Sequence, residues 1–306
     1  MFEPQRPYFV TNRTIQGRLF LTPSNTVNRL VGGVVARALR LYPVALYAFH
    51  FASNHFHLIA SAECGDMLSS FVGYIEANVA KEVGQHIGWR GPFWERRFSA
   101  EPILDDEALV GRLLYTLSHG VKEGLVSTAE DWPGLTCIPE LVHGQKRLFP
   151  WYDRSAQCAA RRRGQPADDA SFASFNAITL TPLPCWTNLS DNDRLTAAAI
   201  AMEHANATAV DAREGKPALG AEAVCAQDPL SVPNHVKRTP RPWCHASTVE
   251  AVRAFKAVYR EFVAAFREAS ALFRAGHAVV EFPEGSFRPR LPFGWHVGPT
   301  TLALAG

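Results

Sequence analysis

Long apolar runs are missing from this chain of 306 residues. A helix that crosses a membrane needs about 20 consecutive apolar residues, and no stretch approaches that length. The N-terminus also lacks a basic segment followed by an apolar one, which a secretory signal would require. We therefore expect a protein without membrane contact that works in the cytoplasm.

Closely spaced cysteines and a strong net charge are missing as well. The six cysteines form none of the Cys-x-x-Cys pairs that zinc ribbons and redox sites use, so they are typical of ordinary reduced thiols. The formal net charge is only +2, but the basic excess lies within residues 1–163. This asymmetry weakly favours a polyanionic partner for the first half of the chain.

What the first 150 residues do have is an alternation of strand-like and helix-like patterns. Strands are predicted at 8–11, 44–50, 55–60 and in the aromatic and basic segment 89–98. Helices are predicted from Ser24 or Asn25 to just before Pro43, over 66–85, and from Asp105 or Asp106 to about Lys122. The order β-α-β-β-α-β-α predicts an α+β fold, with a ferredoxin-like antiparallel sheet, helices on one face and the other face free for a ligand.

The rest of the chain has a different composition. We predict a first domain at 1–150, a linker at 151–185, and a mostly helical C-terminal extension at 186–306, with helices over 191–212 and 248–275. The linker contains Arg161-Arg162-Arg163, a run typical of a solvated linker that could also contact nucleic acid without sequence preference. The sequence gives no role for the extension.

His55-Phe56-His57 is the first pattern that carries chemistry. On a strand, residues two apart project from the same face, so both imidazoles could share a metal ion while Phe56 points into the core. Two histidines on a half-buried strand, satisfied by ordinary hydrogen bonds, are an equally good interpretation of this motif alone.

Tyr115 and His119 form the second pattern. A spacing of four residues places both side chains on one face of the predicted third helix, and a helix docked on the sheet could bring them to the histidine pair. By itself such a pair is more typical of a core tyrosine and a surface histidine.

Four ordered blocks within residues 7–135 together resemble the single-tyrosine HUH transposases, and most closely the REP-associated tyrosine transposases related to the insertion-sequence-200 type. The blocks are Phe9-Val10-Thr11-Asn12-Arg13 with Gly17-Arg18-Leu19-Phe20, Ser53-Asn54-His55-Phe56-His57-Leu58-Ile59, Gly91-Pro92-Phe93-Trp94-Glu95-Arg96-Arg97-Phe98, and Leu114-Tyr115 through Gly124-Leu125-Val126 to Asp131-Trp132-Pro133. The resemblance makes residues 1–150 the transposase domain.

The resemblance implies a metal-dependent DNA transposase of mobile elements. His55 and His57 would be metal ligands, Tyr115 would be the nucleophile, and His119 would occupy the third ligand position. Here the chain departs from the family, which commonly has an amide side chain followed by proline where this chain has His119-Gly120. Mg²⁺ or Mn²⁺ would be the cofactor, and three histidines shift the preference toward borderline metals.

Single-stranded or hairpin DNA, including REP-like elements, is the partner that the resemblance implies, through a covalent 5′-phosphotyrosine. Aromatic and basic side chains suited to such a ligand are Arg13, Arg18, Trp89, Arg90, Trp94, Arg96 and Arg97. Core packing for the tryptophans and a solvated rim for the arginines are about as well supported. We expect a nucleoid-associated monomer or homodimer.

Two other functions remain open from the sequence. A metal-dependent hydrolase of phosphoesters would need the histidine pair but not Tyr115. A domesticated DNA-binding protein that has lost catalysis would fit the altered His119-Gly120.

Overall fold

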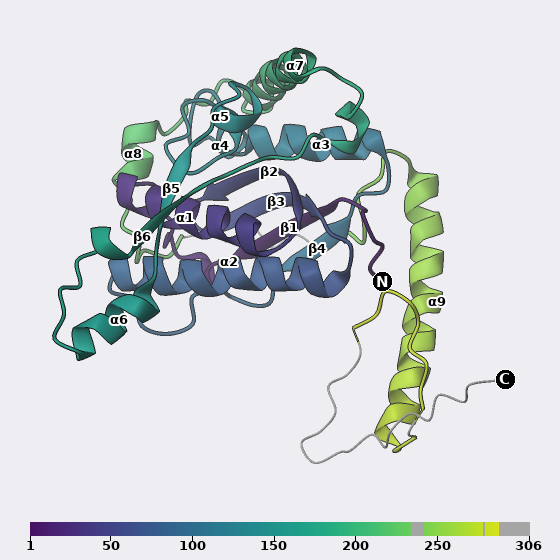
Figure 1. The fold of residues 1–306 in the computed structure, drawn as a ribbon. Helices are drawn as coiled ribbons and strands as arrows, with labels where there is room; N and C mark the ends of the chain where they lie inside the picture. Colours follow the sequence, from purple (N-terminus) through teal and green to yellow (C-terminus); the bar gives the residue numbers. More distant parts are fainter. Residues whose placement is uncertain (234–240, 278, 288–306) are drawn as a thin grey trace.

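A four-stranded antiparallel sheet lies at the centre of the molecule, in strand order β2-β3-β1-β4 (Figure 1). The computed structural model describes residues 1–233, 241–277 and 279–287. The strands are β1 Tyr8–Arg13, β2 Ala45–Ala52, β3 His55–Ser61 and β4 Ser99–Pro102. With α1 Asn25–Leu41 after β1 and α2 Gly65–His86 after β3, this is the predicted ferredoxin-like arrangement. The predicted α+β class is therefore confirmed.

The helices α1 and α2 cover one face of the sheet (Figure 1). Helix α1 begins where the Ser24 side chain accepts a hydrogen bond from the Val27 backbone N–H. Its buried side chains recur at helical spacing, as in Val27, Val31, Val34 and Ala38. This spacing makes one side of α1 apolar, and that side packs on the sheet.

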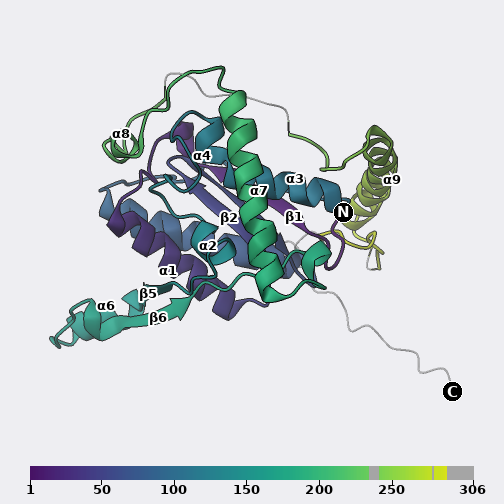
Figure 2. The same cartoon turned by 90° about the horizontal axis from the view of Figure 1, so that it is seen from above.

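The opposite face of the sheet carries α3 Asp106–Leu117, with α7 Asp191–Asp211 packed over it (Figure 2). Asp105 caps α3 by accepting a hydrogen bond from the Ala108 N–H, as predicted. The prediction of one helix to about Lys122 is wrong, because the backbone leaves helical geometry at Ser118 (φ −81°, ψ 2°) and a short helix α4, His119–Lys122, follows. The break turns the His119 side chain toward the sheet.

The strand predicted at 89–98 is also wrong, since β4 begins only at Ser99. Gly91 has a φ of +133° and Pro92 has no N–H to donate, so a regular ladder cannot pass through them. The aromatic residues of this loop pack inward instead, with the Phe93 ring 4.9 Å from that of Phe20 and the Trp94 ring 5.4 Å from that of Phe56. Aromatic content alone therefore gave a false strand signal.

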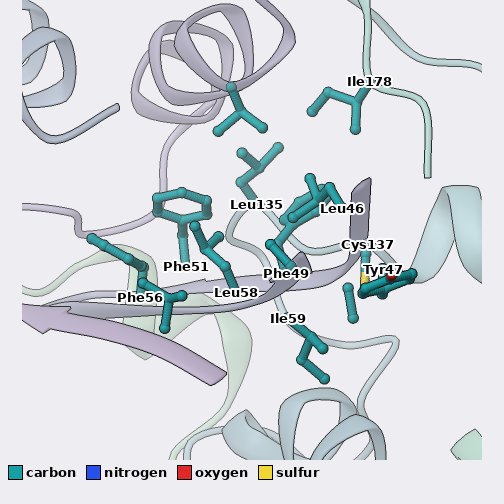
Figure 3. Packing of buried hydrophobic residues seen from close by; sticks show 14 of the residues in the cluster. Leu46, Tyr47, Phe49, Phe51, Phe56, Leu58, Ile59, Leu135, Cys137 and Ile178 are labelled. Atoms are coloured by element: carbon teal, nitrogen blue, oxygen red, sulfur yellow. The ribbon is translucent and has the colours of Figure 1, made fainter. Parts of the chain in front are cut away.

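The hydrophobic core extends beyond the first 150 residues. Leu46, Phe49 and Leu58 of the sheet belong to the same buried cluster as Leu135, Cys137 and Ile178 (Figure 3). Ile178 follows β6 Ala173–Ala177, which pairs with β5 Leu148–Tyr152 in an antiparallel ribbon. Helix α6, Arg154–Arg162, lies between these two strands in the sequence. The range predicted as a linker, 151–185, thus contains ordered elements, while the division into three parts stays a prediction.

The β5–β6 ribbon is seated on α1 through two adjacent glycines. A methyl group added at Gly32 would overlap the Phe149 ring, and one added at Gly33 would overlap the Pro150 carbonyl oxygen. A phenyl ring can move aside, but a backbone carbonyl in a strand cannot move without shifting the ribbon. Gly33 is therefore required for the close approach of α1 and β5.

Gly33→Ala is expected to lower the free energy of unfolding by about 1–3 kcal/mol, because overpacking outweighs the gain in helix propensity. Gly73→Ala in α2 is the matched control, since nothing lies within 4 Å of the added methyl group. That control should gain about 0.5–1 kcal/mol. Urea unfolding midpoints of both variants test this. Equal stability of the two variants would show that the ribbon is not tightly packed on α1.

The C-terminal part is mostly helical, as predicted. Besides α7 it contains α8 Ala221–Cys225 and α9 Val249–Arg274, which lies at the edge of the molecule (Figure 2). The end of the predicted extension, 288–306, lies outside the described residues. The remaining short elements are η1 Ile15–Gly17, α5 Ile138–Leu141, η2 Ala170–Phe172 and η3 Pro184–Trp186. Among the described residues, no helix combines the length and the apolar character needed to cross a membrane.

Candidate metal and nucleophile site

Three histidines meet on the face of the sheet that carries α3. His55 and His57 project from alternate positions of β3, and His119 begins α4. One ring nitrogen from each lies within 4.8 Å of those of the other two, and the Nε2 atoms of His55 and His119 are 2.8 Å apart. Two imidazole nitrogens bound to one metal at bond lengths of 2.0–2.1 Å lie roughly 3 Å apart, so the cluster could bind a metal ion.

His57 shows that the cluster fits a metal better than an ordinary polar core. Its side chain is only 5% exposed, and neither ring nitrogen has a hydrogen-bond partner among the described residues. A buried polar atom without a partner costs about 1–3 kcal/mol. Burial, and next to it the neighbouring His119, hold the pKa of His57 well below its usual range. The ring is therefore neutral, and a neutral imidazole has the lone pair that a metal requires.

Asn54 orients His55. The Nδ1 atom of His55 lies 2.6 Å from the Asn54 Oδ1, and the Asn54 amide donates to the Gly17 carbonyl at 3.0 Å. The amide bond to Gly17 directs Oδ1 toward the ring, so His55 donates from Nδ1 and presents an unprotonated Nε2 to the cluster. Such a partner behind a ligand fixes its tautomer and raises its basicity. No role was predicted for Asn54 from the sequence, although its place directly before the first histidine was a usable signal.

Asn54→Ala is expected to weaken Mn²⁺ binding by about tenfold or more, because His55 loses the acceptor that fixes its tautomer. Asn54→Asp keeps an acceptor oxygen and should retain affinity within a few-fold of the wild type. Isothermal titration with MnCl₂ measures both. If the two variants lose affinity equally, the Asn54 side chain supports the turn and not the tautomer.

Tyr115 lies beside the histidines, on the last turns of α3. The centre of its ring is 5.3 Å from that of His57 and 5.5 Å from that of His119. Burial, and next to it the negative charge of Glu123, raise the pKa of Tyr115 above its usual value, while the positive charges of Arg112 and Arg13 act in the opposite direction. The structure therefore brings together the tyrosine and the three histidines that the sequence singled out separately.

Two cations that were not predicted from the sequence, Arg112 and Lys122, flank the Tyr115 ring. The Arg112 guanidinium carbon is 4.9 Å from the ring centre, and the Lys122 Nζ is 4.8 Å from it. Arg112 lies one turn before Tyr115 on α3, whereas Lys122 lies beyond the break at Ser118, at the end of α4. Positive charge at this distance stabilises a phenolate more than a phenol.

His50 is a further histidine next to the cluster. Its ring centre is 5.3 Å from that of His119 and 5.0 Å from that of Trp132. Burial lowers the pKa of His50 to about 3, so this ring is neutral. It lies outside the group of converging ligand nitrogens and packs behind His119.

The predicted DNA-binding residues divide into three places. Arg13 ends β1, paired in register with His55, so it lies at the histidine cluster. Arg18 stacks over Trp89 at 5.2 Å and donates to the Leu230 carbonyl. Arg90, Arg96 and Arg97 are exposed in the loop before β4.

The two tryptophans of this set have structural contacts. Trp89 packs on Phe20, with ring centres 4.7 Å apart, and Trp94 donates from its indole N–H to the Glu76 carbonyl at 2.9 Å. Both rings are partly buried against the core. Base stacking on them is therefore limited to whatever ring surface the core leaves open.

Comparison with known proteins gives structural likeness only. No family model matches the chain, and no curated protein matches it. One solved structure, a REP-associated tyrosine transposase bound to a REP hairpin, is 20% identical, with a TM-score of 0.41 over 47% of this chain and 82% of that one. A second, a candidate transposase from Deinococcus radiodurans, is 14% identical, with a TM-score of 0.29 over 37% of this chain and 90% of that one. Scores this low do not support an argument about this chain, so its function has to be inferred from the residues of its own site.

Proposed function

We propose that this chain is a single-tyrosine HUH transposase, which cuts and rejoins single-stranded DNA through Tyr115. The observation that supports this most directly is the convergence of Tyr115 with His55, His57 and His119, which come from a strand and from two successive helices. A hydrolase of small phosphoesters would need the histidines alone. The tyrosine beside them, flanked by two cations, favours covalent chemistry.

Each residue of the site has a task in this proposal. Bound Mg²⁺ or Mn²⁺, held by the three histidines, would polarise the scissile phosphate. The Tyr115 oxygen attacks phosphorus, the bond from phosphorus to the 3′ oxygen breaks, and a 5′-phosphotyrosine and a free 3′-OH result. The phenol proton passes to solvent, and the leaving 3′ oxygen takes up a proton. Arg112 and Lys122 stabilise the phenolate and attract the phosphate.

Rejoining follows from the energetics of the exchange. One phosphoester bond replaces another, so the bond energy is retained and a 3′-OH of a second strand can reverse the step without ATP. The target phosphate must be reachable, which favours unpaired or hairpin DNA such as REP-like elements. A chain with this substrate would work in the cytoplasm at the nucleoid. Three neutral imidazoles favour Mn²⁺ over Mg²⁺ as the more effective ion.

The experiment that tests the proposal detects a covalent adduct between protein and DNA. Purified protein is incubated with Mn²⁺ or Mg²⁺ and with labelled single strands from the sequence flanking its own gene, and is then run on a denaturing gel. A band of slowed protein that carries the label, and that disappears with chelator, supports the transposase. Cleavage without an adduct favours the hydrolase, and binding without cleavage in either metal favours a DNA-binding protein that has lost catalysis.

A further inference from the structure

A basic cavity of about 920 Å³ lies between the C-terminal half of α2 and helix α6. Five basic side chains line it, and Asp169 is the acidic residue of the lining. The basic residues are Lys81, Arg154, Arg161, Arg162 and Arg163. The cavity is separate from the histidine cluster, because α6 lies on the side of the molecule where α1 and α2 pack, opposite α3 (Figure 1).

One of the five positive charges, that of Arg154, is neutralised by ion pairs within the protein. Arg154 forms ion pairs with Glu82 at 3.1 Å and with Asp169 at 2.7 Å. Lys81 and residues 161–163 are exposed, and within the described part of the chain they form no ion pair. The cavity therefore carries an excess of positive charge that the protein itself does not balance.

Helix stability does not account for this excess. A basic residue in the last turn of a helix is favourable, and Arg161 and Arg162 occupy the last turn of α6. Three consecutive cations that share the cavity lining with Lys81 also repel one another. A single arginine would complement the helix dipole without this repulsion, so the cluster is better explained by an external anion.

We propose that this cavity binds the phosphate backbone of duplex nucleic acid, without regard to base sequence. Arginine, lysine, serine and glutamine side chains are the usual partners of backbone phosphates, and Ser155 and Gln85 join the basic residues here. Among the residues that the structure describes, no aromatic side chain lines the cavity. Sites for single strands combine positive charge with aromatic stacking platforms, so the lining favours a duplex over an unpaired strand.

The position of α6 suits it to contact duplex DNA next to the site of cleavage. The β5–β6 ribbon carries α6 out from the body of the molecule (Figure 2). If the proposed function holds, α6 would grip a duplex flank or hairpin stem while the opposite face acts on the unpaired strand. Binding itself does not depend on that function, because it needs neither Tyr115 nor a metal.

The test compares two triple variants that remove the same charge. Arg161→Ala/Arg162→Ala/Arg163→Ala empties the cavity of its unpaired arginines. Arg253→Ala/Arg260→Ala/Arg267→Ala removes three exposed arginines from α9, away from the cavity. Affinity for a labelled mixed-sequence duplex of about 20 base pairs is measured by fluorescence anisotropy, with chelator present, over about 50–200 mM KCl. Circular dichroism confirms that both variants fold.

The cavity variant is expected to bind at least about tenfold more weakly at the lowest salt, and the slope of log K against log salt should become shallower by roughly 2–3. The α9 variant should stay close to the wild type in both. Equal losses in the two variants would overturn the proposal in favour of a net-charge effect, and no loss in either would overturn it outright. Since chelator prevents metal-dependent cleavage, a failure here is distinct from a missing covalent adduct.

Discussion

The Tyr115→Phe variant is expected to form no covalent adduct with DNA while binding Mn²⁺ as tightly as the wild-type protein. Only the phenol oxygen is removed, and the ring that packs 5.3 Å from His57 stays in place. No described residue of the cluster offers a second hydroxyl nucleophile at that position. The adduct should therefore fall below detection on a denaturing gel, a loss of at least about a thousandfold, as expected when the nucleophile of a covalent mechanism is removed.

Tyr259→Phe is the matched control for this variant, since Tyr259 is a partly buried helical tyrosine on α9, outside the site. It should form the adduct at the wild-type level. An isothermal titration with MnCl₂ confirms that both variants keep the metal site. If Tyr115→Phe still cleaves DNA at the wild-type rate, Tyr115 is not the nucleophile and the hydrolase becomes the better proposal.

Three strands of the sheet, β1, β2 and β3, and the histidine pair were predictable because they depend on local patterns. The alternation in β3 puts Phe56 and Leu58 on one face and the two histidines on the other, and this follows from the period of a strand alone. The caps at Ser24 and Asp105 were equally visible, because each side chain bonds a backbone N–H three residues ahead. Features that depend on a single helix or strand can therefore be predicted from the sequence.

Features that depend on two distant segments were not predictable. The break falls at Ser118, which is neither proline nor glycine, and the nearest glycine, Gly120, comes two residues later within α4. The His119 Nε2 nevertheless lies 2.8 Å from that of His55. The loop 89–98 resembled a strand because its aromatic residues belong to the hydrophobic core, where Phe93 packs on Phe20 and Trp94 on Phe56, and only tertiary packing reveals this. Arg112 and Lys122 were not predicted for a similar reason. Basic residues a few positions from a tyrosine are common in sequences, and only the fold shows that this tyrosine lies at the histidine cluster.

His57→Ala is expected to weaken Mn²⁺ binding by more than about 100-fold, because loss of a residue behind a ligand already costs about 10–100-fold. The effect on stability should depend on metal. Without metal the substitution leaves a cavity but also removes two buried nitrogens that have no partner among the described residues, so the two effects partly cancel. With Mn²⁺ at about 100 times the dissociation constant, the wild type should gain about 2.7 kcal/mol of stability and the variant almost none.

Thermal unfolding with and without MnCl₂ separates these contributions, with His143→Ala as the control at an exposed histidine outside the cluster. The control should show the full metal-dependent rise in melting temperature. A rise of equal size in His57→Ala would mean that metal binds elsewhere and that the buried imidazole has a purely structural role. If only His57→Ala loses the metal-dependent rise in melting temperature, His57 binds the metal. The free energy of metal binding then offsets the cost of burying, in the metal-free protein, its two ring nitrogens that have no partner among the described residues.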